Sequence, residues 1–190
     1  MTYGYFDNDR REYVITDPRT PVKWINYIGT LAFGGFVDHT GGSALCKGDP
    51  ALNRITWYVP QRPDSDFNGT TLYLRIPADG EGESATVFSP FYVPGLTPYD
   101  HYACHVGLGY TRIVSEMHGV RTEATIFVPQ GASCEVRDIK ITNVSDGPIT
   151  LDAIPVVDYS HPEAMKQFNN NDWVPQTMVS EAVKADRKSV

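Results

Sequence analysis

The stretch VRTEATIFV, residues 120–128, carries the clearest structural signal in this chain of 190 residues. Val120, Ala124, Ile126 and Val128 occupy alternate positions, and alternation of apolar and polar residues is typical of a β-strand with one buried face. The sequence PQG follows and predicts a turn. This strand is the reference from which the rest of the fold is predicted.

Strand signals continue on both sides of it. A second strand is expected over residues 134–143, with a bulge near Arg137 and Asp138 because the apolar phase slips there. VSDG at 144–147 predicts a turn, after which residues 150–159 are expected to return as the partner of 134–143. Further strands are expected over residues 11–16, 33–38, 54–59, 71–76, 85–88, 101–104, 110–116 and 176–181, and a helical turn over 162–168.

These short, turn-rich elements define the fold class. No amphipathic helix of convincing length interrupts them, so the sequence predicts an all-β, antiparallel β-sandwich. Residues 1–160 are expected to form the sandwich domain and residues 161–190 to begin further strands. Because no closing element follows, we expect the sandwich to be cut at its C-terminal end.

Composition excludes several classes of function. The net charge is −7, from 23 acidic and 16 basic residues, and no basic stripe is visible, so nucleic-acid binding is disfavoured. The chain opens without a secretory signal and has no apolar run near the ~20 residues of a membrane span. Cys46, Cys104 and Cys134 are expected to be reduced thiols. Together these features predict a cytoplasmic protein without membrane contact.

Motifs for catalysis and metal binding are weak. DSDFNG at 64–69 matches the first half of a calcium loop, but Arg75 replaces the final glutamate, so a hairpin turn is the preferred interpretation. His101 and His105 would share one face of a strand without further ligands, as ordinary strand histidines do. No nucleophile elbow, P-loop or dinucleotide fingerprint occurs, so we assign no catalytic residue and no metal ligand.

One stretch is rich in both aromatic residues and glycine: WINYIG at 24–29, FGGF at 33–36 and HTGG at 39–42. Such residues suit a sugar-binding surface, but they also suit a strand-turn-strand corner in any β protein. Asp38, His39 and Asp49 flank the glycines and form the best polar candidate, although solvated loop side chains are the simpler interpretation.

Eight blocks of sequence, taken in order, resemble the N-terminal domain of the cellobiose and chitobiose phosphorylase family. The blocks are YGYFD (3–7), REYVIT (11–16), WINYIG (24–29), His39 with Gly41-Gly42, RIT (54–56), GLGY (107–110), FVP (127–129) and TNVSD (142–146). These inverting glycoside phosphorylases were formerly classed as glycosyltransferase family thirty-six. The likeness covers residues 3–146 and is looser to about 160.

The resemblance implies a large, galactose-mutarotase-like super-sandwich domain followed by a helical linker and an (α/α)6 barrel. In the family the barrel carries the general-acid Asp, and inorganic phosphate attacks the anomeric carbon, so a β-linked disaccharide becomes a sugar 1-phosphate and a free sugar. The parent polypeptide is therefore expected to be a transferase without a bound cofactor. The 190-residue chain alone is expected to be inactive.

The resemblance also assigns a role to the glycine-rich loop. In similar enzymes this domain forms much of the homodimer contact, and the loop approaches the acceptor sugar in the neighbouring subunit. Carried over by position, the loop spans residues 38–49, and its expected substrate-binding residues are His39, Thr40, Gly41, Gly42 and Ser43. Departures from the family pattern occur in SALCK at 43–47, FSPFY at 88–92 and CHV at 104–106. Residues 44–47 of the SALCK segment are where specificity is expected to lie.

Two other functions remain open from sequence. The chain could be a stand-alone carbohydrate-binding sandwich, for which Trp57-Tyr58 and Phe91-Tyr92 are the best support, although such aromatics more often fill a core. It could also be a purely structural dimerisation domain. The sugar stays equally open: cellobiose, chitobiose, laminaribiose or another β-linked glucoside would fit the resemblance.

Overall fold

The computed structural model describes residues 2–59, 68–78, 80, 82, 84–163, 165 and 166. Nearly all regular structure in these ranges is β-strand. The strands are β1 (Gly4–Asp7), β2 (Glu12–Ile15), β3 (Ile25–Gly29), β4 (Gly34–Asp38), β5 (Ser43–Cys46), β6 (Thr70–Ile76), β7 (Thr86–Phe88), β8 (His101–Gly107), β9 (Tyr110–Met117), β10 (Val120–Phe127), β11 (Val136–Asn143) and β12 (Asp152–Val157).

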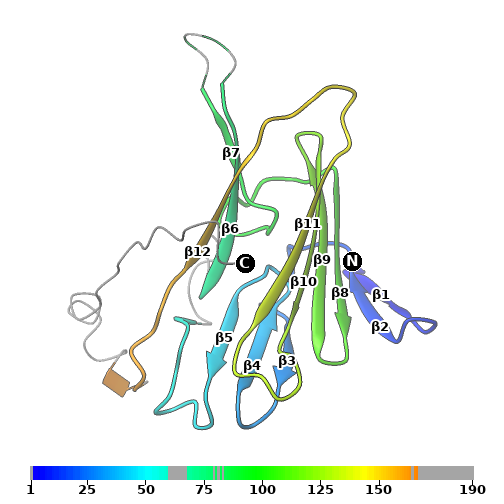
Figure 1. The fold of residues 1–190 in the computed structure, drawn as a ribbon. Helices are drawn as coiled ribbons and strands as arrows, with labels where there is room; N and C mark the ends of the chain where they lie inside the picture. Colours follow the sequence, from blue (N-terminus) through cyan, green and yellow to red (C-terminus); the bar gives the residue numbers. More distant parts are fainter. Residues whose placement is uncertain are drawn as a thin grey trace.

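The strands form three antiparallel sheets (Figure 1). The largest has the order β1-β2-β8-β9-β10-β11, and two smaller ones have the orders β12-β6-β7 and β3-β4-β5. Consecutive hairpins build most of the large sheet, because turns such as the one at Gly119 join neighbouring strands directly. The predicted all-β, antiparallel sandwich is confirmed.

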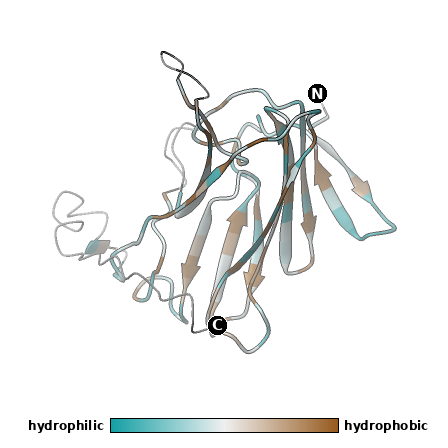
Figure 2. Ribbon diagram, turned by 45° about the horizontal axis from the view of Figure 1, so that its top comes forward, coloured by the Kyte–Doolittle hydropathy of each residue, from teal (hydrophilic) through white to brown (hydrophobic). Residues whose placement is uncertain are grey.

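The hydrophobic core lies between the sheets. Alternate residues of β10 are buried, as predicted, and Ala124 packs with Ile113 of β9 against Leu72 and Leu74 of β6. A second cluster joins the β3-β4-β5 sheet to the end of β10 through Ile28, Val37, Leu45 and Ile126. The strands of this small sheet are largely hydrophobic (Figure 2).

The predicted partner of β11 is wrong. Residues 150–159 do contain a strand, β12, but it pairs with β6 rather than with β11. The connection after β11 crosses over the end of the sandwich to the other layer (Figure 1), where Ile149 and Leu151 pack against the core. Pro155 fits this position because β12 is an edge strand of its sheet. Proline has no backbone N–H, and on an edge strand that missing donor need not cost a hydrogen bond between strands.

The bulge expected near Arg137 is also wrong. The register between β10 and β11 runs without interruption from Val120 opposite Asn143 to Phe127 opposite Val136. The apolar pattern slips in the sequence because Val136 lies on the outer face, opposite Phe127. Arg137 points inward instead, where its guanidinium donates to Ser43 Oγ at 3.1 Å.

Most other expected strands occur with shifted ends, and β8 and β9 extend beyond their expected ranges. Strands β1, β3 and β5 were not among the expected strands. Residues 54–59 form no continuous strand but two isolated bridges, one between Arg54 and Cys46 and one between Thr56 and Tyr159. The expected strand at 176–181 lies outside the described residues, and the helical turn over 162–168 is described in helical geometry only at Met165 and Lys166.

Candidate functional site

The connection between β4 and β5 is a tight loop organised by Asp38. Asp38 Oδ1 accepts hydrogen bonds from the backbone N–H of Thr40 at 2.7 Å, from the Thr40 hydroxyl at 2.7 Å and from the N–H of Gly42 at 3.2 Å. Its Oδ2 accepts from the Tyr58 hydroxyl at 2.8 Å. Because Asp38 is only 1% exposed, these donors replace water around the buried carboxylate.

His39 is buried with its hydrogen bonds satisfied. Its Nδ1 accepts the N–H of Trp24 at 3.2 Å, which assigns the proton to Nε2, and Nε2 lies 2.8 Å from the carbonyl oxygen of Pro18 and 3.1 Å from Thr20 Oγ1. Burial lowers the pKa of His39. Its carbonyl oxygen accepts a bond from the Tyr102 hydroxyl. His39 therefore acts as a neutral structural histidine within this domain.

The two glycines of the loop are required by close packing. Gly41 has φ +84°, and a Cβ there would lie 2.8 Å from the ring of Phe91. A Cβ on Gly42 would lie 2.7 Å from Asp38 Oδ2 and 2.9 Å from the carbonyl oxygen of Asn68. Either contact is shorter than side chains tolerate, so the loop needs glycine for its own packing.

The structure corrects the expected extent and exposure of this loop. Ser43 is the first residue of β5, and most of SALCK belongs to this strand, which pairs with β4. The turn between the two strands therefore spans only residues 39–42. Asp38 and His39 are buried rather than solvated. Asp49 lies in the exposed turn beyond β5, where its Oδ1 accepts the N–H of Ala51 at 2.8 Å.

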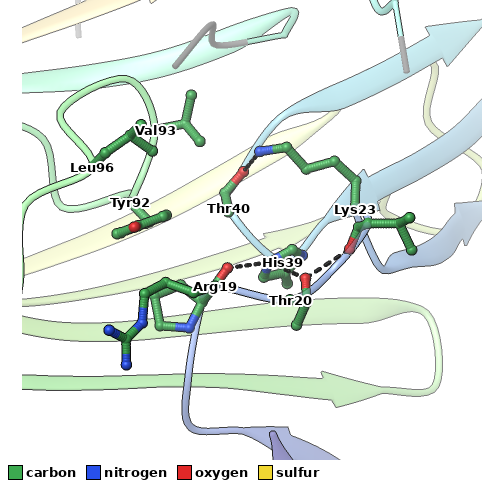
Figure 3. A pocket seen from close by; sticks show the side chains of 10 residues that line it. Arg19, Thr20, Lys23, His39, Thr40, Tyr92, Val93 and Leu96 are labelled. Carbon is green, nitrogen blue, oxygen red and sulfur yellow. Dashed lines mark hydrogen bonds between the residues drawn. The ribbon is translucent and has the colours of Figure 1, made fainter. Parts of the chain in front are cut away.

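The five expected substrate-binding residues are thus brought together, and two of them line a hollow between described residues. His39 and Thr40 line a hollow of about 110 Å³ together with Lys23 and Tyr92. Figure 3 shows Lys23 reaching Thr40, whose hydroxyl accepts from Nζ at 2.7 Å, while Arg19 directs its guanidinium the opposite way. Gly41, Gly42 and Ser43 do not line this hollow. The arrangement offers hydrogen bonds and a shaped surface, and it suits binding.

Lys23, Arg19 and Tyr92 were not predicted as site residues. Lys23 directly precedes WINYIG, and Tyr92 belongs to FSPFY, one of the departures from the family pattern. Two sequence signals pointed to the loop that contributes Tyr92: that departure, and the pair Phe91-Tyr92 as support for a carbohydrate-binding sandwich. The pairing of residues 16–23 with this loop depends on contacts across the fold, which no local pattern shows.

The aromatic residues divide between core and surface. Tyr58 and Phe91 are buried, in agreement with the interpretation of these aromatics as core residues. Trp24 packs against the main core, whereas Tyr27 is 73% exposed. WINYIG serves the scaffold through Asn26, whose side-chain amide lies 2.8 Å from the carbonyl oxygen of Tyr110.

His105 of β8 contacts protein groups. His105 Nδ1 lies 2.8 Å from Glu12 Oε2, and the Tyr110 hydroxyl donates to Glu12 Oε1 at 2.5 Å. Burial raises the pKa of Glu12, but these two hydrogen bonds outweigh it and the net shift is downward. In the described ranges no group of three His, Cys, Asp or Glu residues could hold a metal ion. Residues 64–67 of the calcium-like loop lie outside those ranges.

Two other structural findings bear on the sequence expectations. Cys46, Cys104 and Cys134 are all unpaired thiols. Within the part of the chain that the structure describes, no helix has the length and apolar character needed to cross a membrane.

Comparison with known proteins now decides the family. The family model described as glycosyl hydrolase 94, supersandwich domain, matches residues 11–188. The chain belongs to this family. The resemblance seen in the eight sequence blocks is thereby confirmed, and the three-sheet sandwich is the fold of a glycosyl hydrolase 94 supersandwich domain.

The curated relatives of this supersandwich domain are phosphorylases. An N,N'-diacetylchitobiose phosphorylase of Vibrio furnissii is 37% identical over 162 residues, which cover 84% of this chain and 20% of the relative. The enzyme of the same name from Vibrio proteolyticus is 34% identical over 175 residues, covering 90% and 21%. A 3-O-beta-D-glucopyranosyl-beta-D-glucuronide phosphorylase of Paenibacillus borealis is 32% identical over 149 residues, covering 78% and 17%. The chain spans about a fifth of the length of these relatives.

Proposed function

We propose that this supersandwich domain is the carbohydrate-binding and dimerisation part of a phosphorylase that cleaves a β-linked disaccharide with inorganic phosphate. The observation that carries the proposal is the family match over residues 11–188. The substrate class comes from the two Vibrio relatives, which are named for N,N'-diacetylchitobiose. We propose the same disaccharide here.

A domain exchange tests this function. The matching region of the Vibrio furnissii phosphorylase is replaced by this chain, and release of sugar 1-phosphate from N,N'-diacetylchitobiose is measured. At 37% identity we expect the hybrid to fold and to retain activity. A folded hybrid that cleaves cellobiose but not N,N'-diacetylchitobiose would contradict the proposed substrate. The 190-residue chain alone is expected to release no sugar 1-phosphate.

Within this function, the loop at residues 39–42 is proposed to line the acceptor subsite of the partner subunit, together with the start of β5. Support comes from its rigidity: Asp38 and Phe91 hold the turn in one conformation, which suits a wall against a sugar.

Replacing Gly42 with Ala should displace the turn, because its Cβ would lie 2.7 Å from Asp38 Oδ2. We expect the acceptor KM of the hybrid to rise in the synthetic direction while kcat changes less. Gly147→Ala is the matched control, since a Cβ there meets nothing within 4 Å. If Gly42→Ala lowers stability but leaves the acceptor kinetics equal to those of Gly147→Ala, the loop has a structural role only.

Dimerisation is supported by the outer face of the β3-β4-β5 sheet. A groove of about 650 Å³ crosses this face and is lined by apolar groups that include Tyr27, Phe36 and Ala44. Leu31 is 95% exposed at its rim. Apolar patches of this kind mark association surfaces, and we propose that a second copy of the domain covers this one.

A further inference from the structure

The hollow lined by His39 and Thr40 opens into a larger cleft. This cleft separates residues 16–23 from the loop at residues 89–101 and contains a larger hollow of about 520 Å³. The two hollows share four lining residues: Pro18, Arg19, Tyr92 and Leu96. They are therefore adjoining parts of one cleft, wide at one end and narrow at the other.

Tyrosine rings form a wall of the wide part. Tyr92 and Tyr99 both line it, with ring centroids 6.5 Å apart, and the ring of Tyr102 lies 5.8 Å beyond Tyr99. Tyr99 is held in place because its hydroxyl donates to the carbonyl oxygen of Ser89 at 2.9 Å. A fixed aromatic wall is the surface against which the C–H face of a sugar ring packs at low entropic cost.

A planar polar pair faces the same space. Arg19 Nε donates to Asp17 Oδ1 at 2.9 Å and Nη2 to Oδ2 at 2.8 Å, so the two groups lie in a bidentate arrangement. The hydrogen bond from Arg19 lowers the pKa of Asp17, which keeps the carboxylate ionised. Two adjacent sugar hydroxyls match this pair, because one can donate to the carboxylate and the other can accept from the guanidinium.

The narrow part is small and chemically mixed. Val22, Val93 and Leu96 supply aliphatic surface, and Lys23 and Thr40 supply the polar side (Figure 3). Its volume of about 110 Å³ admits a group of a few heavy atoms. An acetamido group has four heavy atoms, with a methyl group that suits the aliphatic side and a carbonyl oxygen that suits the ammonium.

We propose that this cleft binds a 2-acetamido sugar, with the ring against Tyr92 and Tyr99 and the acetamido group in the narrow hollow. The choice of sugar rests on the proposed function, which names an acetylated disaccharide. The site shares His39 and Thr40 with the acceptor loop and extends beyond it, since its other lining residues come from residues 16–23 and from the segment 92–102.

The test is a titration of the ¹⁵N-labelled 190-residue chain followed by NMR, with N-acetylglucosamine and glucose as the two probes. We expect N-acetylglucosamine to shift amide signals in residues 16–23 and 89–101, and to bind about tenfold more tightly than glucose. Equal affinity for the two sugars would overturn the acetamido assignment. Shifts confined to the groove around Tyr27 and Phe36 would overturn the site.

Four variants refine the test. Val22→Phe fills the narrow hollow, and since Val22 is 66% exposed the variant should fold; we expect it to lose the preference for N-acetylglucosamine. Tyr92→Ala should weaken binding of both sugars about tenfold, whereas Tyr92→Phe keeps the ring and should bind normally. Tyr27→Ala is the control on the other face and should bind as the unaltered chain does. Unchanged binding by Val22→Phe and Tyr92→Ala would refute the proposal.

The outcome is separable from that of the proposed function. A hybrid phosphorylase that cleaves N,N'-diacetylchitobiose, combined with a chain that binds no N-acetylglucosamine in this cleft, would refute the cleft alone. A chain that binds N-acetylglucosamine through Tyr92, combined with a folded but inactive hybrid, would refute the phosphorylase assignment alone.

Discussion

Asp38 is the residue on which the loop between β4 and β5 depends. Its two carboxylate oxygens accept four hydrogen bonds inside the domain, three from the loop and one from Tyr58. Asp38→Ala leaves these buried donors without an acceptor, and we expect it to lower the free energy of unfolding by roughly 3 kcal/mol.

The comparison variant is Tyr58→Phe, which removes one of the four donors and is expected to cost about 1 kcal/mol. Urea unfolding at neutral pH measures both values. A cost for Asp38→Ala no greater than that for Tyr58→Phe would mean that the loop holds its shape without the carboxylate.

His39 gives the fold a dependence on pH. Burial lowers its pKa in the folded state, although Asp38 opposes the shift, so the unfolded chain takes up this proton first as pH falls. The contribution of His39 to stability is therefore complete above its ordinary pKa of about 6.5 and is lost as pH falls below that value. We expect His39→Gln to be less stable at pH 7.5 and to lose less stability than the unaltered chain between pH 7 and pH 5.

Unfolding at several pH values measures this difference. Burial also lowers the pKa of His105, which contributes with the same sign, but that residue is present in both proteins and cancels in the comparison. Parallel curves of stability against pH for the two proteins would show that His39 takes up its proton as readily in the folded state as in the unfolded chain.

At the scale of elements, local pattern predicted strands better than it predicted their partners. Strand β10 was found because its buried residues alternate, and β9 was found as the strand that a short turn joins to it. The pairing of β12 with β6 was missed because it joins residues almost eighty positions apart, and loop length says nothing about which layer the chain enters next. The bulge was predicted wrongly because Val136 is apolar on the outer face.

The same limit applied to the candidate site. Gly41 and Gly42 indicated a tight turn, but the burial of His39 depends on Pro18, Thr20 and Trp24, which lie on a different segment. A polar residue beside glycines is usually predicted to lie in a solvated loop. In the fold, however, Pro18, Thr20 and Trp24 take the place of water around His39. Only the three-dimensional contacts reveal that exchange.

The pairing of β12 can be tested by cross-linking. Tyr73 and Ile154 are directly opposite in the β6-β12 ladder, so cysteines at both positions are expected to form a disulfide on mild oxidation. The background is Cys134→Ser, because Cys134 is an exposed free thiol. A matched control pairs Ile154→Cys with Ile141→Cys on β11, which should stay reduced. Cross-linking of the control pair but not of the first would restore the pairing predicted from sequence.

At the scale of the whole molecule, the two outer faces differ in character. The outer face of the six-stranded sheet carries ion pairs, such as Arg121 with Glu116 at 2.5 Å, whereas the β3-β4-β5 sheet presents an apolar groove. Water solvates the first face well and the second poorly. Any association of this domain should therefore use the second face.

Tyr27 is the residue at which to test that expectation. It is 73% exposed on β3, and its ring packs edge-on against Phe36 in the groove, so Tyr27→Lys should cost little stability while placing a charge on the apolar face. We expect the unaltered chain to associate as its concentration rises, and the dissociation constant to rise about tenfold or more in the variant. Sedimentation velocity measures the dissociation constant.

The control is Phe6→Lys, because Phe6 is 76% exposed on β1 and its replacement should leave association unchanged. Association that is weakened equally by both substitutions would place the contact elsewhere.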